Sequence, residues 1–317
     1  MSQSCSMTDF FVMSYTTFRK ADIEKLVIDL GLPAVLITKK RQKFTALEAL
    51  VVLLVRFASA DKWEKHIVWL GGRDRSEYSK VFYMVVEFVW ERYGSRLAGV
   101  HEWDAEASFF AACAVEKGSP APRVMGFIDG TFRKIPRPSK HQRRFYSGYK
   151  KAHGVKFQTV QAVNGLIIDF YGPVLGRHGD GFLFSRSKLV ARMQELWRRT
   201  GGMFYVYGDP AYKLSRFCLR GFKGGCTPEQ RAFSRDMSAM RVTVEWGYGA
   251  VVKAWPLLDF RPRNKFGEVP VAKFYGTGVF LYNLHTSMYG SEVSAFFACP
   301  PPAVGDYLRL VAGTPRV

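Results

Sequence analysis

The sequence is poor in cysteine, in acidic residues and in long apolar runs, and each shortage excludes a class of protein. Its five cysteines are odd in number and scattered, with no CxxC pair. We therefore expect reduced thiols in a cytosolic or nuclear protein, without a structural zinc site. The most apolar stretch, residues 46–54, stops at Arg56 and is too short to span a bilayer. Residues 1–20 lack the pattern of a secretory signal, so we expect no membrane partner.

Positive charge is in clear excess. The chain carries 46 Lys and Arg against 27 Asp and Glu, which gives a net charge of +19. A protein this basic usually binds a polyanion, most often nucleic acid, because each neutralised phosphate releases condensed counterions. We therefore expect double-stranded DNA as a partner. A solvated basic surface without a partner is the alternative.

Composition and periodicity divide the chain into four parts. These are an N-terminal segment (1–44), a helix-turn-helix region (45–100), a connecting segment (101–122) and an α/β domain (123–317). The first part contains the basic run Lys39-Lys40-Arg41, followed by Lys43. Such a run is typical of a nuclear-import signal and predicts a nuclear protein, although it is also common on exposed surfaces.

The helix-turn-helix prediction rests on apolar spacing and on a glycine turn. A first helix after Thr45 has its apolar residues at intervals of three and four: Leu47, Leu50, Val51 and Leu54. A second amphipathic stretch, 63–70, ends at Gly71-Gly72, and Asp74 and Glu77 then have capping-box spacing. The helix that follows would turn one face inward: Val81, Phe82, Val85, Val86 and Val89.

The start of that last helix is basic, as expected where such motifs touch DNA. The candidate DNA-binding side chains there are Arg73, Arg75 and Lys80, with Ser76 and Ser79 between them. The alternative is a plain helical cap that packs on the next domain.

Strand patterns begin after Pro122. Residues 124–128 form a short apolar strand ending at Asp129, and 156–163 and 166–175 form two strands joined by the hairpin signal Asn164-Gly165. A helix (182–199), a strand (203–207) and a further helix (235–252) follow. This order predicts an α/β fold with a mixed sheet flanked by helices.

Three acids are candidates for metal chemistry. Asp129 and Asp209 each follow an apolar strand, and Glu245, separated from Asp209 by 35 intervening residues, lies in an apolar helix. Ligand sites gather at the carboxyl ends of strands, and carboxylate oxygens suit Mg²⁺ or Mn²⁺. Each acid also has a plainer interpretation, because strand-end aspartates form Asx turns and Glu245 could pair with Arg241 or Lys253.

Several segments resemble the PIF/Harbinger-type DDE transposases and their derived nucleases. The segments are Ile128-Asp129-Gly130-Thr131, Arg137-Pro138, QRRFYSGY (142–149), GRHGDGF (176–182), YGDPAY (207–212), VEWGYG (244–249) and NLHTSMYG (283–290). The resemblance covers roughly residues 45–310 and occurs in the same order as in the family.

The resemblance implies an RNase H-like DDE nuclease domain in which Asp129, Asp209 and Glu245 are the catalytic, metal-binding triad. It also places Asp180 on the family's additional aspartate, a further metal ligand. Here Gly179 separates His178 from that aspartate, whereas the family usually has the histidine directly before it. His178 is either a partner of the ligands or a loop histidine. A divalent metal ion, Mg²⁺ or Mn²⁺, is the implied cofactor, and a separate Myb-like DNA-binding protein is an implied partner.

A basic stretch follows the first acid. Residues 129–160 contain nine Lys or Arg and a single acid, Asp129 itself. The candidates for phosphate contacts are Arg143, Arg144, Lys150 and Lys151, and the aromatic residues among them (Phe145, Tyr146 and Tyr149) either stack on unpaired bases or pack under the sheet.

The sequence thus predicts a DNA-binding, metal-dependent endonuclease or transposase. The rivals are a domesticated DNA-binding protein without cleavage activity and a hydrolase of small phosphates. The latter explains neither the helix-turn-helix nor the charge. The oligomeric state stays open, with a homo-oligomer among the options.

Overall fold

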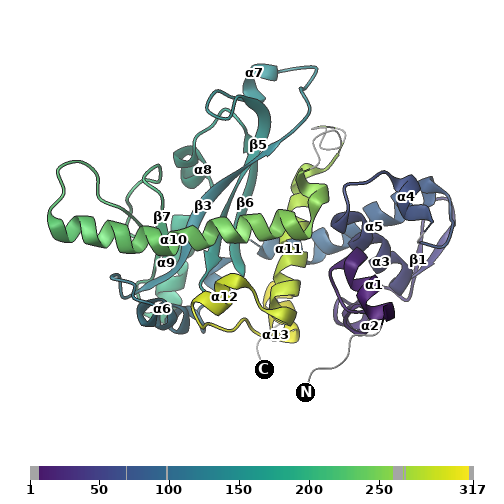
Figure 1. The fold of residues 1–317 in the computed structure, drawn as a ribbon, viewed down its shortest axis with the longest axis horizontal. Coiled ribbons are helices and arrows are strands. Elements are labelled where there is room, and N and C mark those ends of the chain that lie inside the picture. Colours follow the sequence, from purple (N-terminus) through teal and green to yellow (C-terminus); the bar gives the residue numbers. More distant parts are fainter. Residues whose placement is uncertain (1–6, 69, 98, 260–266, 268, 314–317) are drawn as a thin grey trace.

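The computed structural model describes residues 7–313 except 69, 98, 260–266 and 268. Figure 1 shows two parts side by side: a mixed sheet with its helices, and a helical region built from the N-terminal third of the chain. Cys5 and the last four residues of the predicted α/β domain lie outside the described residues. Among the helices that are described, none combines the length and apolar character needed to cross a membrane.

The large sheet has the strand order β6-β5-β3-β7-β8, and β4 extends it beside the far end of β5. β5 is antiparallel to both β3 and β6, whereas β7 is parallel to β3 and to β8. The strands are β3 (Val124–Lys134), β4 (Tyr146–Ser147), β5 (Ala152–Ala162), β6 (Ile167–Leu175), β7 (Tyr205–Gly208) and β8 (Cys218–Arg220). This confirms the predicted mixed α/β architecture and is compatible with an RNase H-like fold.

The helices around the sheet pack on its strands or on one another. They are α6 (Ala107–Glu116), α7 (Gln142–Phe145), α8 (Asp180–Arg186), α9 (Leu189–Thr200), α10 (Pro228–Ala254), α11 (Val271–Tyr289), α12 (Glu292–Phe296) and α13 (Val304–Ala312), with short 3-10 turns at Gly94–Arg96, Val100–Glu102 and Pro256–Asp259. The buried amide of Asn283 in α11 donates to the carbonyl of Ile167 and accepts from its N–H, which ties the helix to the edge strand β6. Figure 1 shows α10 crossing the sheet.

Two predicted elements differ in extent from those observed. The first strand does not end at Asp129, because its antiparallel pairing with β5 continues to Lys134. The predicted helix over 182–199 is two helices, since Lys188 has a φ of +57° and interrupts the helical path between α8 and α9. The hairpin at Asn164-Gly165 is confirmed, with Gly165 at a φ of +87°.

Two further differences come from short-range signals. α10 begins seven residues before the expected start at Arg235, because Thr227 and Gln230 form a capping box. The three-residue strand β8 was not predicted from the sequence, being too short to show a period.

The helical region comprises α1 (Met7–Thr16), α2 (Lys20–Asp29), a small hairpin of β1 (Val35–Ile37) and β2 (Lys43–Thr45), α3 (Ala46–Ala58), α4 (Trp63–Ile67) and α5 (Arg75–Tyr93). The predicted inward face of α5 is confirmed, since all five of its residues are buried. Leu47 was predicted to face inward with Leu50 and Leu54, but it is 41% exposed while those two are fully buried. Asp74 caps α5 by accepting from the Ser76 N–H, so the predicted capping box with Glu77 is wrong.

Aromatic packing joins the two parts of the molecule. Phe82 of α5 packs edge-on against Phe274 of α11, and Phe57 of α3 packs edge-on against Trp255. These side chains belong to a hydrophobic core that continues from the helical region to the sheet. The helical region is therefore packed against the α/β part of the chain rather than held by a linker.

Candidate active site

Asp129 and Asp209 are neighbours because their strands pair in parallel. The register sets Ile128 beside Gly208, so the next residue on each chain is an aspartate. The carboxylate of Asp129 accepts from the Gly130 N–H at 2.8 Å, and that of Asp209 accepts from the Ala211 N–H at 2.9 Å. The second contact is an Asx turn. The plainer interpretation of Asp209, an Asx turn, is therefore present. It does not prevent this aspartate from lying beside Asp129.

Asp180 approaches the same place from the first turn of α8. A Cβ atom on Gly130 would lie 2.7 Å from its carboxylate oxygen Oδ1, so only glycine at position 130 leaves room for this carboxylate. The ammonium of Lys156 on β5 donates to the same oxygen at 3.0 Å, and that lysine side chain is only 14% exposed. Asp180 therefore lies against Gly130, close enough for its charge to act on Asp129.

The grouped aspartates change one another's protonation. Burial raises the pKa of Asp129 from 3.8 to about 6, and the negative charges of Asp209 and Asp180 add to this rise. The Gly130 N–H and the Arg241 guanidinium act in the opposite direction without cancelling it. A carboxyl that resists ionisation beside two other acids marks a place where a cation would be stabilised.

Glu245 lies at the margin of this group. Its side chain, on α10, is 57% exposed and pairs with Arg241 at 3.4 Å, while Arg241 lies 3.9 Å from Asp129. The i,i+4 pairing that we considered as the plainer role is therefore present, and Arg241 stands between the two acids. In the described part of the chain no three His, Cys, Asp or Glu side chains are close enough together to hold a metal ion.

Two tyrosines of the site were not singled out from the sequence, although both lie inside the family-like segments. Tyr248 donates to the backbone carbonyl of Asp129 and accepts from Thr159 at 2.7 Å. It thereby fixes α10 to β3 and β5 directly at the acid. Tyr212, the residue directly after the Asx turn of Asp209, is completely buried. The repeated pairing of an acid with a nearby tyrosine in YGDPAY and EWGYG was the available signal.

His178 does not contact the acids. Its ring stacks on Phe182 with centroids 3.9 Å apart, and its Nε2 faces Arg177 at 3.4 Å. Partial burial and the arginine lower the pKa of His178. Of the two roles considered, the structure favours that of a loop histidine.

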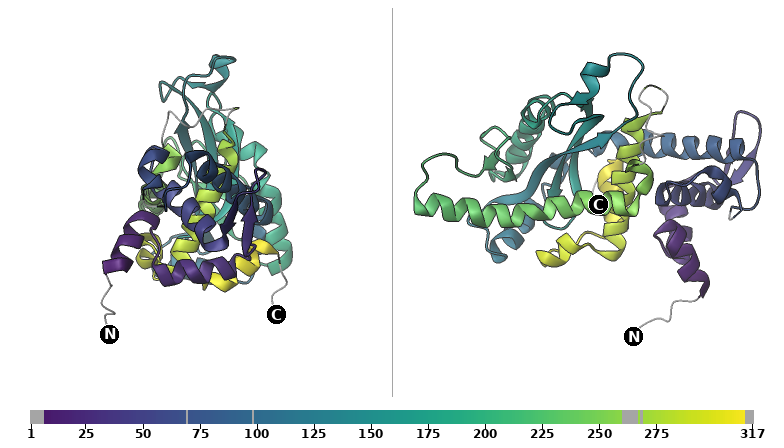
Figure 2. Two further views of the ribbon diagram at one scale, coloured as in Figure 1. Left: turned by 90° about the vertical axis from the view of Figure 1, so that its right-hand side faces the viewer. Right: turned by 45° about the horizontal axis from the view of Figure 1, so that its top comes forward.

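The basic stretch after β3 forms a projecting arm, which we call the basic finger (residues 137–151). It includes α7 and the turn before β5, and it extends past the end of the sheet (Figures 1 and 2). Its four predicted phosphate-binding residues are exposed, and among the described residues none of them forms an ion pair: Arg143, Arg144, Lys150 and Lys151.

The aromatic residues of the basic finger divide between the two roles considered for them. Phe145 is buried, whereas Tyr149 is 89% exposed beside the Lys150 ammonium. Phe145 therefore has the packing role, and the Tyr149 ring is exposed and available to stack on a base.

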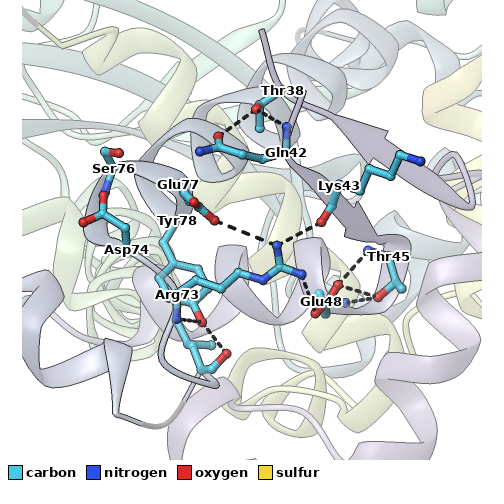
Figure 3. Close-up of polar contacts among 11 residues, drawn as sticks. Thr38, Gln42, Lys43, Thr45, Glu48, Arg73, Asp74, Ser76, Glu77 and Tyr78 are labelled. Atoms are coloured by element: carbon cyan, nitrogen blue, oxygen red, sulfur yellow. Dashed lines mark hydrogen bonds and ion pairs between the residues drawn. The ribbon is translucent and has the colours of Figure 1, made fainter. Parts of the chain in front are cut away.

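The basic residues at the start of α5 have a different environment. Figure 3 shows the Arg73 guanidinium bound to the Lys43 carbonyl at 3.0 Å, to Glu48 at 3.3 Å and near Glu77 at 3.9 Å. Arg75 pairs with Glu64 at 3.1 Å. The ammonium of Lys80 is buried and has no hydrogen-bond partner among the described residues. Arg73 thus joins the β1–β2 hairpin to α3 and α5, a structural role that the sequence did not suggest.

The part of the chain that carries these acids is similar to known proteins. Residues 128–275 match the DDE superfamily endonuclease domain. Over 166 residues the chain is 26% identical to a "Probable transposase for insertion sequence element IS702" of Microchaete diplosiphon, which covers 52% of this chain and 59% of that protein. No solved structure matches significantly. The domain match includes Asp129, Asp180, Asp209 and Glu245, and with the transposase similarity it supports a DDE-type endonuclease domain in this chain.

Proposed function

We propose that this protein binds double-stranded DNA and cuts it as a divalent-metal-dependent endonuclease or transposase of the PIF/Harbinger type. The observation that carries the proposal is the parallel register of β3 and β7, which makes Asp129 and Asp209 neighbours. The match to the DDE endonuclease domain over the same residues supports it.

The residue types present suit a divalent cation, which would have to draw the acids closer together than they lie among the described residues. Asp129, Asp180 and Asp209 offer hard carboxylate oxygens, and they are balanced in this structure by two protein cations, Lys156 and Arg241. These aspartates would hold Mg²⁺ or Mn²⁺, and Glu245 would join them on release from Arg241. The ion, when bound, supplies charge stabilisation at the phosphodiester and a more acidic water. The expected product carries a 3′ hydroxyl, which a transposase would then direct at target DNA.

The basic finger would position the DNA. β3 runs five residues from Asp129 to Lys134, about 17 Å at ~3.3 Å per strand residue, and the finger begins three residues later. That distance corresponds to about five base pairs of duplex at ~3.4 Å each. Arg143, Arg144, Lys150 and Lys151 would therefore contact phosphates outside the cleaved step, and the exposed Tyr149 would stack on an unpaired base.

Other parts of the proposal rest on the sequence. The start of α5 would serve as a helix-turn-helix contact through the exposed Arg75. The Lys39–Arg41 run would direct the protein to the nucleus, and a Myb-like protein would assist DNA recognition. That run lies exposed in the turn between β1 and β2.

The test is plasmid nicking with Mg²⁺ or Mn²⁺. Wild type should nick the plasmid, and Asp209→Asn should reduce nicking to background. Asp236→Asn removes the same charge from α10 beside Arg235, away from the acid group, and should nick like wild type. Equal cleavage by wild type and Asp209→Asn would remove the assignment. Tight DNA binding without nicking by any of the proteins would favour the domesticated DNA-binding protein.

A further inference from the structure

Tyr212 carries a buried hydroxyl that the fold leaves without a partner. The residue is 0% exposed, and its Oη has no hydrogen-bond partner among the described residues. Buried tyrosine hydroxyls normally form a hydrogen bond, because leaving one unpaired is costly. An unpaired hydroxyl in a fixed position therefore indicates a hydrogen-bond acceptor that comes within reach when the site binds its metal ion.

The ring of Tyr212 is held so that its hydroxyl points at the acids. A Cβ on Gly208 would lie 2.9 Å from the ring, so glycine at this position allows the ring to lie against β7. Phe184 of α8 packs edge-on against the other side at 5.8 Å between centroids. The Oη lies 3.6 Å from where a Cβ on Gly130 would be, and the Asp180 carboxylate approaches the same point at 2.7 Å.

The Tyr212 hydroxyl carries one O–H donor, and an ionised carboxylate is an acceptor only, so the two groups are complementary.

We propose that Tyr212 is a positioning residue whose hydroxyl donates to a carboxylate of the Asp129–Asp180–Asp209 group when a divalent cation draws these acids together. The inference rests on the proposed function. Hydrogen bonds of this kind orient ligands and commonly change metal affinity by 10–100-fold. The hydroxyl has no hydrogen-bond partner among the described residues and would gain one in the metal-bound site, so it would favour metal binding.

The experiment measures Mn²⁺ binding to the full chain, by the loss of the free Mn²⁺ signal in electron paramagnetic resonance. Tyr212→Phe should weaken Mn²⁺ binding about tenfold, with a melting temperature in EDTA equal to or above that of wild type. Phenylalanine fills the same space and removes only the unpaired hydroxyl. Tyr207→Phe is the matched control, since Tyr207 is a buried tyrosine on β7 whose hydroxyl lies near Gly221 instead of the acids. It should bind Mn²⁺ like wild type.

The outcomes separate this inference from the proposed function. Wild-type Mn²⁺ affinity in Tyr212→Phe, together with loss of binding in Asp209→Asn, would overturn the role of Tyr212 alone. A lower melting temperature of Tyr212→Phe in EDTA would also overturn it, since the hydroxyl would then support the metal-free fold. Unchanged Mn²⁺ binding in Asp209→Asn would instead overturn the proposed metal site.

Discussion

Replacing Asp129 by asparagine should make the metal-free protein more stable at neutral pH, although it removes a residue of the proposed active site. Asparagine keeps the shape of the side chain and the oxygen that accepts from the Gly130 N–H. It removes the charge that burial and the neighbouring aspartates oppose. The rise in the pKa of Asp129 from 3.8 to about 6 corresponds to about 3 kcal/mol, at ~1.4 kcal/mol per pH unit.

The sign of the effect follows from which state holds the proton more tightly. The folded protein retains the Asp129 proton up to about pH 6, whereas the unfolded chain loses it near 3.8. The free energy of unfolding of wild type therefore falls as the pH rises through this interval, and the full cost is present above it. Asparagine is neutral throughout. The advantage of Asp129→Asn should be small near pH 4, grow to about pH 6 and then stay level at up to about 3 kcal/mol.

The assay is urea unfolding of both proteins in EDTA across this pH range, with Asp236→Asn as the control for removing a more exposed carboxylate. Saturating Mn²⁺ should remove most of this advantage. At a free concentration 100 times the dissociation constant it stabilises wild type by about 2.7 kcal/mol and should leave Asp129→Asn nearly unchanged. The reasoning is refuted if Asp129→Asn is the less stable protein in EDTA at pH 8, or if the difference does not vary with pH.

Other parts of the structure give three further predictions. Replacing the four cations of the basic finger by glutamine should make the plot of log binding constant against log salt concentration less steep, by about 3 to 4. An unchanged slope would mean that DNA binds elsewhere on the protein. Gly130→Ala should push Asp180 away and weaken Mn²⁺ binding in calorimetry, since its Cβ would lie 2.7 Å from that carboxylate; unaltered affinity would exclude Asp180 as a ligand. Arg192→Met should lower the free energy of unfolding in guanidinium by about 3–5 kcal/mol, because it leaves the fully buried Asp169 without its 2.8 Å ion pair. A decrease below about 1 kcal/mol would contradict this.

The parts of the fold with strong local signals could be predicted from the sequence. The Asn164-Gly165 hairpin, the apolar strands before the two aspartates and the inward face of α5 all depend on short-range patterns. Boundaries that depend on tertiary pairing could not be read in this way. β3 continues past Asp129 only because β5 offers a long antiparallel partner, and β8 is too short to show a pattern.

The site was predictable to a similar degree. The approach of Asp129 to Asp209 follows from two strand ends, which sequence patterns reveal. The interposed Arg241, the Lys156 contact to Asp180 and the hydroxyl of Tyr212 depend on how α10, β5 and the turn after β7 meet in space. Likewise, the basic side chain Arg73 looked available for DNA, yet the fold uses it to join three elements.

Anomalous X-ray scattering from crystals of the full chain soaked in Mn²⁺ tests the central claim most directly. The account predicts an anomalous peak within coordination distance of carboxylate oxygens of both Asp129 and Asp209, and its loss in Asp209→Asn crystals. Mn²⁺ bound elsewhere, with these two carboxylates free of it under conditions that support DNA cleavage, would contradict the account.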